Sequence, residues 1–265
     1  MVTFIPLDLV DLALAATLIV VNGVLSLVLR LRLERQLLIA VARMVIQLAL
    51  VSLILTTLFE NVSLLWTSLA AAAMVLFAGR EIMARQERRL TGLWSYGLGT
   101  SCMLFAGVLV TVFALTTQVS PEPWYHPRFA LPLLGMILGN TMTGVSLGLH
   151  TLTTGLARDF AAVEARLALG ATRHEALLPV TRTAMRSGLI PVVNSMAAAG
   201  LVHLPGMMTG QILAGISPYD AVQYQILVMF LIAGATAMGV VAAVLGGAFR
   251  LTDNRHRLRL DRLTG

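Results

Sequence analysis

Lysine is absent from this 265-residue chain, because all 19 basic residues are arginine. A P-loop needs a lysine at the nucleotide phosphates, so the chain carries no Walker A site of its own. Its single cysteine, Cys102, lies in an apolar run, which excludes a disulfide framework and a cysteine-based metal cluster. The HExxH zinc-protease motif is also missing. We therefore expect no catalytic residues and no cofactor bound by this chain.

Charged residues are scarce, at 12% of the chain against 57% hydrophobic residues. With a mean hydropathy of +0.84, this composition is typical of an integral membrane protein. The pI near 10.6 would suggest nucleic-acid binding in a soluble protein. Here the arginines fall in short segments between apolar runs, where membrane topology explains them, so membrane lipid and not nucleic acid is the expected environment.

Seven apolar stretches are long enough to cross a bilayer, which needs about 20 helical residues. The sequence therefore predicts an all-α fold, a polytopic transmembrane helical bundle of about seven spans in one permease domain over residues 1–265. The predicted spans are 7–29, 37–58, 62–79, 93–117, 129–150, 187–216 and 222–249.

The arginines divide unequally between the two sides of this bundle. When the loops are assigned alternately, one side receives Arg128 alone and the other receives the remaining eighteen. The positive-inside rule then places the C-terminus in the cytoplasm and the N-terminus outside. We expect the protein in the bacterial cytoplasmic (inner) membrane.

One long hydrophilic interruption, residues 151–186, faces the cytoplasm in this topology. Within it, Arg158 to Leu169 predicts an amphipathic helix, and Gly170 supplies a helix stop. Thr172 and Glu175 have the spacing of a capping box that starts a second helix. A short rigid helix on a bundle without a catalytic domain would suit docking to a partner protein. The alternative is an interfacial helix lying on lipid headgroups.

The segment from Glu164 to Thr172 resembles the Glu-Ala-Ala loop of ATP-binding-cassette (ABC) permeases, although Arg166 replaces the second alanine of that pattern. Nearly the whole chain resembles the bacterial iron-export ABC permease family, which includes plant aluminium-tolerance relatives. The segments that carry this resemblance are 138–144, 164–175 and 204–215.

The resemblance implies a coupling helix that docks on an ABC ATPase subunit, with ATP and Mg held by that partner. It also implies a homodimer of permease chains and export of iron or a related metal. The residues that the resemblance and the loop pattern assign to ATPase coupling are Glu164, Ala165, Arg166, Leu167, Gly170, Ala171, Thr172 and Glu175.

Polar residues inside the predicted spans are candidates for the substrate pathway, because polar groups in hydrocarbon are costly and usually face the bundle interior. Asn140 and Thr143 lie in the fifth span, where the alternative is a hydrogen bond to a neighbouring helix. His203, Met207 and Gln211, next to Met208, follow at spacing four in the sixth span. If that span is one helix kinked at Pro205, they share a face.

Imidazole and thioether groups bind transition metals, so His203 and Met207 are candidate metal ligands. The alternative for this face is packing, because methionine often fills cores. For the whole protein, the alternative to an ABC permease is a secondary transporter or channel for cations. That protein would transport without an ATPase.

Overall fold

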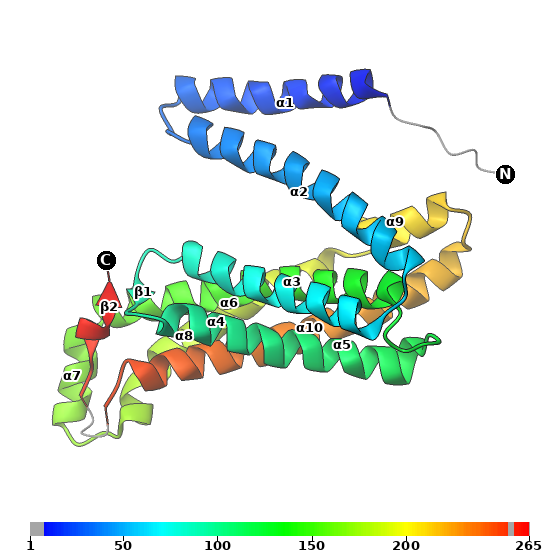
Figure 1. The fold of residues 1–265 in the computed structure, drawn as a ribbon. Helices are drawn as coiled ribbons and strands as arrows, with labels where there is room; N and C mark the ends of the chain where they lie inside the picture. Colours follow the sequence, from blue (N-terminus) through cyan, green and yellow to red (C-terminus); the bar gives the residue numbers. More distant parts are fainter. Residues whose placement is uncertain (1–7, 254–256, 265) are drawn as a thin grey trace. The chain divides into compact units, whose positions relative to one another are not determined.

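The structure is a computed structural model that describes residues 8–253 and 257–264. The chain forms two compact units. The first holds α1 and α2, together with residues 213–216, and the second holds residues 62–212 and 217 onward. Figure 1 traces the helices of both units along the chain.

The first unit is a helical hairpin of α1 (Leu9–Val28) and α2 (Glu34–Glu60). Its turn is fixed by Ser26, whose hydroxyl donates to Glu34 Oε2 and accepts from the Leu33 amide, both at 3.0 Å. Apolar side chains surround both helices instead of forming one stripe. A helix that is apolar on all sides is typical of a membrane span.

The second unit contains most of the secondary structure. Its elements are α3 (Leu64–Ala84), β1 (Arg89–Leu90), α4 (Trp94–Met103), η1 (Leu104–Val108), α5 (Leu109–Ala114), η2 (Leu115–Val119), α6 (Pro127–Arg158), α7 (Phe160–Ala168), α8 (Arg173–Ala198), α9 (Gly206–Leu213), α10 (Pro218–Arg250), η3 (Leu260–Arg262) and β2 (Leu263–Thr264). Segments η1 and η2 are π-helical, so α4 to η2 form one continuous helical run. The predicted all-α class is confirmed.

Six helical segments in the described part of the chain are long and apolar enough to cross a membrane. They correspond to six of the seven predicted spans: Val10–Val28, Glu34–Glu60, Leu64–Ala84, Trp94–Val119, Pro127–Arg158 and Pro218–Arg250. The prediction of one continuous span over 187–216 is wrong. That stretch consists of the end of α8, an irregular segment and α9, because Gly200 adopts a left-handed φ of +85° and Pro205 lies just before α9.

Helix α8, which is not among the six candidate spans, packs against both α6 and α10. Gly144 of α6 lies against Gly188 of α8, whereas Gly155 lies against Val180, so the two helices are antiparallel. Gly144 lies near Thr236 of α10 and Gly148 near Val244, so α6 and α10 run in the same direction. Along the chain, α8 therefore runs back toward the end of the bundle where α6 begins, and α10 then runs in the direction of α6. The count of seven crossings and the outside location of the N-terminus remain predictions.

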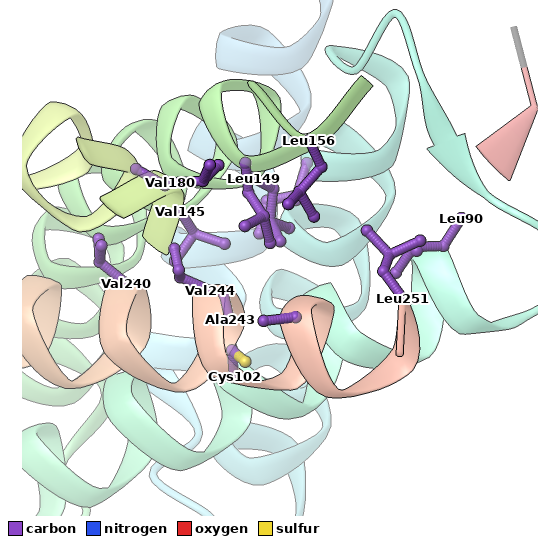
Figure 2. Close-up of a cluster of buried hydrophobic side chains, with 14 of the residues drawn as sticks. Leu90, Cys102, Val145, Leu149, Leu156, Val180, Val240, Ala243, Val244 and Leu251 are labelled. Carbon is purple, nitrogen blue, oxygen red and sulfur yellow. The ribbon is translucent and has the colours of Figure 1, made fainter. Parts of the chain in front are cut away.

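Small residues bring α6, α8 and α10 together. A Cβ atom at Gly188 would lie 2.7 Å from the carbonyl oxygen of Gly144, and a Cβ at Gly144 would lie 2.8 Å from that of Gly188. In lipid no hydrophobic driving force acts between helices. Close packing of their backbones stabilises the association instead. Around this contact, Val145, Val240 and Val244 are fully buried and form part of the core shown in Figure 2.

The C-terminal segment after α10 closes one end of this unit. Leu251 and Leu258 are buried in the same hydrophobic cluster as Leu90, and β2 pairs with β1 in an antiparallel two-stranded sheet. The amide of Thr91 also donates to the carbonyl oxygen of Arg262 at 2.8 Å. This segment therefore joins the α3–α4 connection to the end of the bundle where α7 lies (Figure 1).

Candidate functional site

The predicted hydrophilic loop 151–186 is almost entirely helical. Residues up to Arg158 continue α6, and residues from Arg173 onward belong to α8. Only α7, nine residues long, stands between them. The predicted helix over Arg158 to Leu169 is thus confirmed in type, with its start shifted to Phe160, because Asp159 ends α6 and precedes α7.

A tight turn at Gly170 separates α7 from α8. After α7, Gly170 adopts a φ of +92°, and the Ala171 amide donates to the carbonyl oxygen of Arg166 at 3.0 Å. The predicted capping box then starts α8: the Glu175 amide donates to Thr172 Oγ1 at 3.3 Å, and the Thr172 amide donates to Glu175 Oε2 at 2.9 Å. The stop and start signals were readable in the sequence because both depend on local backbone chemistry.

One face of α7 is anchored in the bundle. Val163 is 3% exposed, and Leu167 and Ala171 pack against the main hydrophobic cluster. Glu164 also points toward the protein, since its Oε1 accepts a hydrogen bond from the Leu258 amide of the C-terminal segment at 3.3 Å. These contacts fix the helix in orientation and leave its other face open.

The open face of α7 is small and mostly apolar. Leu169 at its end is 89% exposed, and Arg166 is exposed as well. The remaining exposed members are Phe160, Ala161, Ala162, Ala165 and Ala168. This face thus consists mainly of alanines, with Phe160 near its start, Leu169 at its end and Arg166 between them. We call Ala162, Ala165, Arg166 and Leu169 the α7 outer face.

Glu175 and Thr172 serve the start of α8 in this structure. Hydrogen bonds from the Thr172 backbone amide and hydroxyl, with a smaller contribution from nearby His174, lower the pKa of the Glu175 carboxyl. Both residues are exposed. They therefore hold the α7–α8 turn in place beside the α7 outer face.

The candidate pathway residues on α6 are exposed on the second unit. Asn140 Nδ2 donates to the carbonyl oxygen of Met136 at 2.8 Å, and Thr143 Oγ1 donates to that of Gly139 at 3.1 Å. Each side chain thus bonds within its own helix, so the alternative of a hydrogen bond from Asn140 to a neighbouring helix is not what the structure has. Asn194 of α8, a residue that the sequence analysis did not select, is exposed as well.

The predicted shared helical face of His203, Met207 and Gln211 is wrong. His203 lies before α9, in an irregular segment where the Gly200 amide donates to its carbonyl oxygen at 3.0 Å. Met207 packs against a hydrophobic cluster, and Met208 and Gln211 are half-buried on the eight-residue helix α9. Residues four positions apart lie on the same side of a helix only where that helix is continuous. The proposed kink at Pro205 is replaced by a break.

The described residues contain no cluster of three or more His, Cys, Asp or Glu side chains that could hold a metal ion. His203 and Met207 therefore stay predicted ligands without a third partner of that kind. Gly144 to Gly148 also has the Gly-x-Ser-x-Gly spacing of a hydrolase, which the sequence analysis passed over. That motif acts at a strand-to-helix turn, whereas these residues lie inside α6 and Ser146 is buried.

Comparison with known proteins identifies relatives along most of the chain. A UPF0014 membrane protein of Synechocystis is 38% identical over 86% of this chain and 86% of its own. Protein ALUMINUM SENSITIVE 3 of Arabidopsis thaliana is 33% identical over 87% of this chain and 82% of its own. The probable iron export permease protein FetB of Escherichia coli is 32% identical over 96% and 95%. No solved structure matches the chain.

These relatives confirm the resemblance drawn from the three sequence segments, including its plant aluminium branch. The uncharacterised protein family UPF0014 matches residues 9–251, which span every candidate transmembrane helix. The chain is a multi-pass helical membrane protein that belongs to the UPF0014 family.

Proposed function

We propose that this chain is the permease subunit of an ABC transporter that exports iron or a related metal across the bacterial cytoplasmic membrane. The single observation that supports the coupling role is the exposure pattern of α7. Its inner face is anchored by buried Val163, and its outer face ends in Leu169, which is 89% exposed. The metal and the direction rest on the relative named as a probable iron export permease. ATP and Mg would be bound by the separate ATPase.

The connections of α7 suit it to transmit movement. It is joined to α6 through Asp159 alone and to α8 through the Gly170 turn. Helices α6 and α8 contact each other backbone to backbone at Gly144 and Gly188. Because close-packed helices move as rigid bodies and do not deform continuously, a push on α7 would shift the α6–α8 pair together.

The exposed polar residues on α6 and α8 support a homodimer. Asn140 and Thr143 of α6, and Asn194 of α8, are exposed on the second unit. An amide facing lipid is costly, so a second copy that covers this surface would shield it. A cation path at that seam would be lined by Asn140 and Thr143, with His203 and the α9 residues Met207, Met208 and Gln211 as further predicted contacts.

Transport by reconstituted protein tests the proposal. The chain would be placed in liposomes together with an ABC ATPase from the same organism, and efflux of Fe(II) would be followed with a metal-sensitive dye. Charge reversal in Arg166→Glu or loss of the projecting side chain in Leu169→Asp should weaken ATPase binding and abolish ATP-driven transport. Arg88→Glu changes another exposed arginine and should leave both unchanged.

The two competing functions give different results in the same assay. Transport without ATPase, driven by an ion gradient, would identify a secondary transporter and overturn the proposal. Normal ATP-driven transport by both α7 variants would remove α7 from the coupling role. His203→Ala with unchanged metal affinity and rate would remove His203 from the pathway.

A further inference from the structure

A cavity of about 230 Å³ lies where α4 begins and α10 ends. Both helices are candidate membrane spans that terminate here, at Trp94 and at Arg250. The C-terminal segment supplies the remaining wall through Arg262. The cavity thus sits at a membrane boundary, on the arginine-rich side of the protein.

Two guanidinium groups face this cavity. Arg250 stacks over Trp94, with its Cζ 4.8 Å from the indole ring, and its Nε is buried with no hydrogen-bond acceptor among the described residues. Arg262 donates from Nη1 to the carbonyl oxygen of Arg250 at 2.7 Å, which fixes the second guanidinium beside the first. A buried donor without an acceptor is costly unless a ligand satisfies it.

The charges of the lining favour an anion. Asp253 contributes one carboxylate, and its Oδ1 accepts a hydrogen bond from the Arg257 amide at 2.9 Å. Two guanidinium groups against one carboxylate leave a net charge of +1. A phosphodiester carries a single negative charge and offers acceptor oxygens that match guanidinium donors, so it would neutralise the site.

An apolar groove of about 300 Å³ lies along α4. Trp94 lines both the groove and the cavity, and Leu93, Gly97, Leu98 and Ser101 complete the groove. Leu93 is 85% exposed, and Trp94 is half exposed. Tryptophan at this position is typical of the membrane interface, where its ring lies at the level of the headgroups. A ligand that fills both spaces must be charged at one end and apolar at the other.

We propose that this cavity and groove bind an anionic phospholipid, with the phosphodiester on Arg250 and Arg262 and an acyl chain along Gly97. A free phosphate would satisfy the same two arginines but would leave the groove empty. The site is separate from the α7 outer face and does not depend on the proposed transport function. Because Arg262 is bound to the α3–α4 connection through Thr91, an occupied site would fasten the C-terminal segment to the membrane surface.

Native mass spectrometry of the purified full-length protein tests the site, with short-chain phosphatidylglycerol and phosphatidylcholine as probes. We expect phosphatidylglycerol to bind at least about tenfold more tightly, and both Arg250→Gln and Arg262→Gln to remove about tenfold of that affinity, in line with a charged hydrogen bond. Arg257→Gln makes the same charge change on an exposed residue and should bind as the parent protein does.

Filling the groove distinguishes a lipid from a free phosphate. A Cβ at Gly97 meets no atom within 4 Å, so Gly97→Leu should fold normally while blocking an acyl chain. This variant should lose phosphatidylglycerol. Normal phosphatidylglycerol binding by Gly97→Leu, together with competition by inorganic phosphate, would assign the site to a soluble anion and overturn the lipid proposal. Equal binding of the two lipids, or an equal loss in Arg257→Gln, would overturn it as well.

Discussion

The backbone amide of Leu258 donates a hydrogen bond to Glu164 Oε1 at 3.3 Å, although 94 residues separate the two. This bond attaches the C-terminal segment to the inner side of α7, beside the buried side chain of Val163. Glu164 is the first residue of the segment that resembles the ABC permease loop, and its side chain contacts the protein itself. Its influence on a docked ATPase would be indirect, through the position of α7.

Glu164→Ala should therefore loosen the C-terminal segment. Removing the acceptor would forfeit about 1 kcal/mol, so amide hydrogen exchange over residues 257–264 should accelerate about fivefold. Glu164→Gln keeps an oxygen acceptor and should exchange at nearly the parent rate. Unchanged exchange in Glu164→Ala would show that the bond does not hold this segment.

Gly170→Val should disturb the turn between α7 and α8. The φ of +92° at Gly170 is unfavourable for residues with a Cβ, at a cost of about 1–2 kcal/mol that is largest for β-branched residues. A Cβ at this position would meet no atom within 4 Å, so the penalty comes from the backbone alone. Gly170→Asn, which tolerates positive φ better, is the matched control. Equal thermal stability of the two variants in detergent would contradict this account.

Removing the Thr172 hydroxyl should weaken the start of α8. Loss of a threonine N-cap typically costs about 1 kcal/mol, so Thr172→Ala should raise exchange of the first-turn amides, whereas Thr172→Ser should not. Thr172→Ala should also move the pKa of Glu175 upward, because one of the hydrogen bonds that lower it is lost. NMR titration of the Glu175 carboxyl, assigned with Glu175→Gln, measures this change.

The lowered pKa of Glu175 also fixes the direction of a pH effect. The pKa of the Glu175 carboxyl is lower in the folded protein than in the unfolded chain. The stability that the ionised carboxylate gives to the folded protein is therefore fully present above the unfolded pKa and is lost as pH falls through the folded pKa. The α7–α8 turn should accordingly loosen in acid and not in base. First-turn exchange in α8 that is insensitive to acid beyond its intrinsic pH dependence would contradict this.

Gly188→Ala should destabilise the bundle. The new Cβ would lie 2.7 Å from the carbonyl oxygen of Gly144, and a backbone oxygen cannot rotate away as a side chain can. We expect a loss of about 1–3 kcal/mol, seen as a lower Tm in detergent. Gly234→Ala on the exposed side of α10, where a Cβ meets nothing within 4 Å, should cause no loss.

Asn140→Cys should cross-link two copies of the chain if α6 lies at a dimer seam. The experiment uses a Cys102→Ala background, because Cys102 is the only native cysteine. Mild oxidation in membranes should give a disulfide-linked dimer through residue 140. Phe77→Cys on α3, which is 65% exposed, should remain monomeric. A cross-link through residue 77 and none through residue 140 would move the seam away from α6.

Local signals in the sequence were read correctly wherever neighbouring residues decide the conformation. The stop at Gly170 and the capping box of Thr172 and Glu175 depend on atoms within a few residues of each other. The prediction of the sixth span was wrong because hydrophobicity over a long stretch does not show where the backbone breaks. Apolar composition alone joined the end of α8 to α9, whereas the positive φ of Gly200 and the proline before α9 break the helix and separate His203 from Met207.

By itself, the sequence determined that this is an α-helical membrane protein, because lipid requires long apolar helices whose backbone bonds are internal. The sequence also determined which residues form α7. Only the tertiary structure decided which way the side chains of α7 face, that Glu164 meets Leu258, and that α8 packs against both α6 and α10. Those contacts join residues about 45 to 95 positions apart, and no local pattern specifies which distant surfaces will meet.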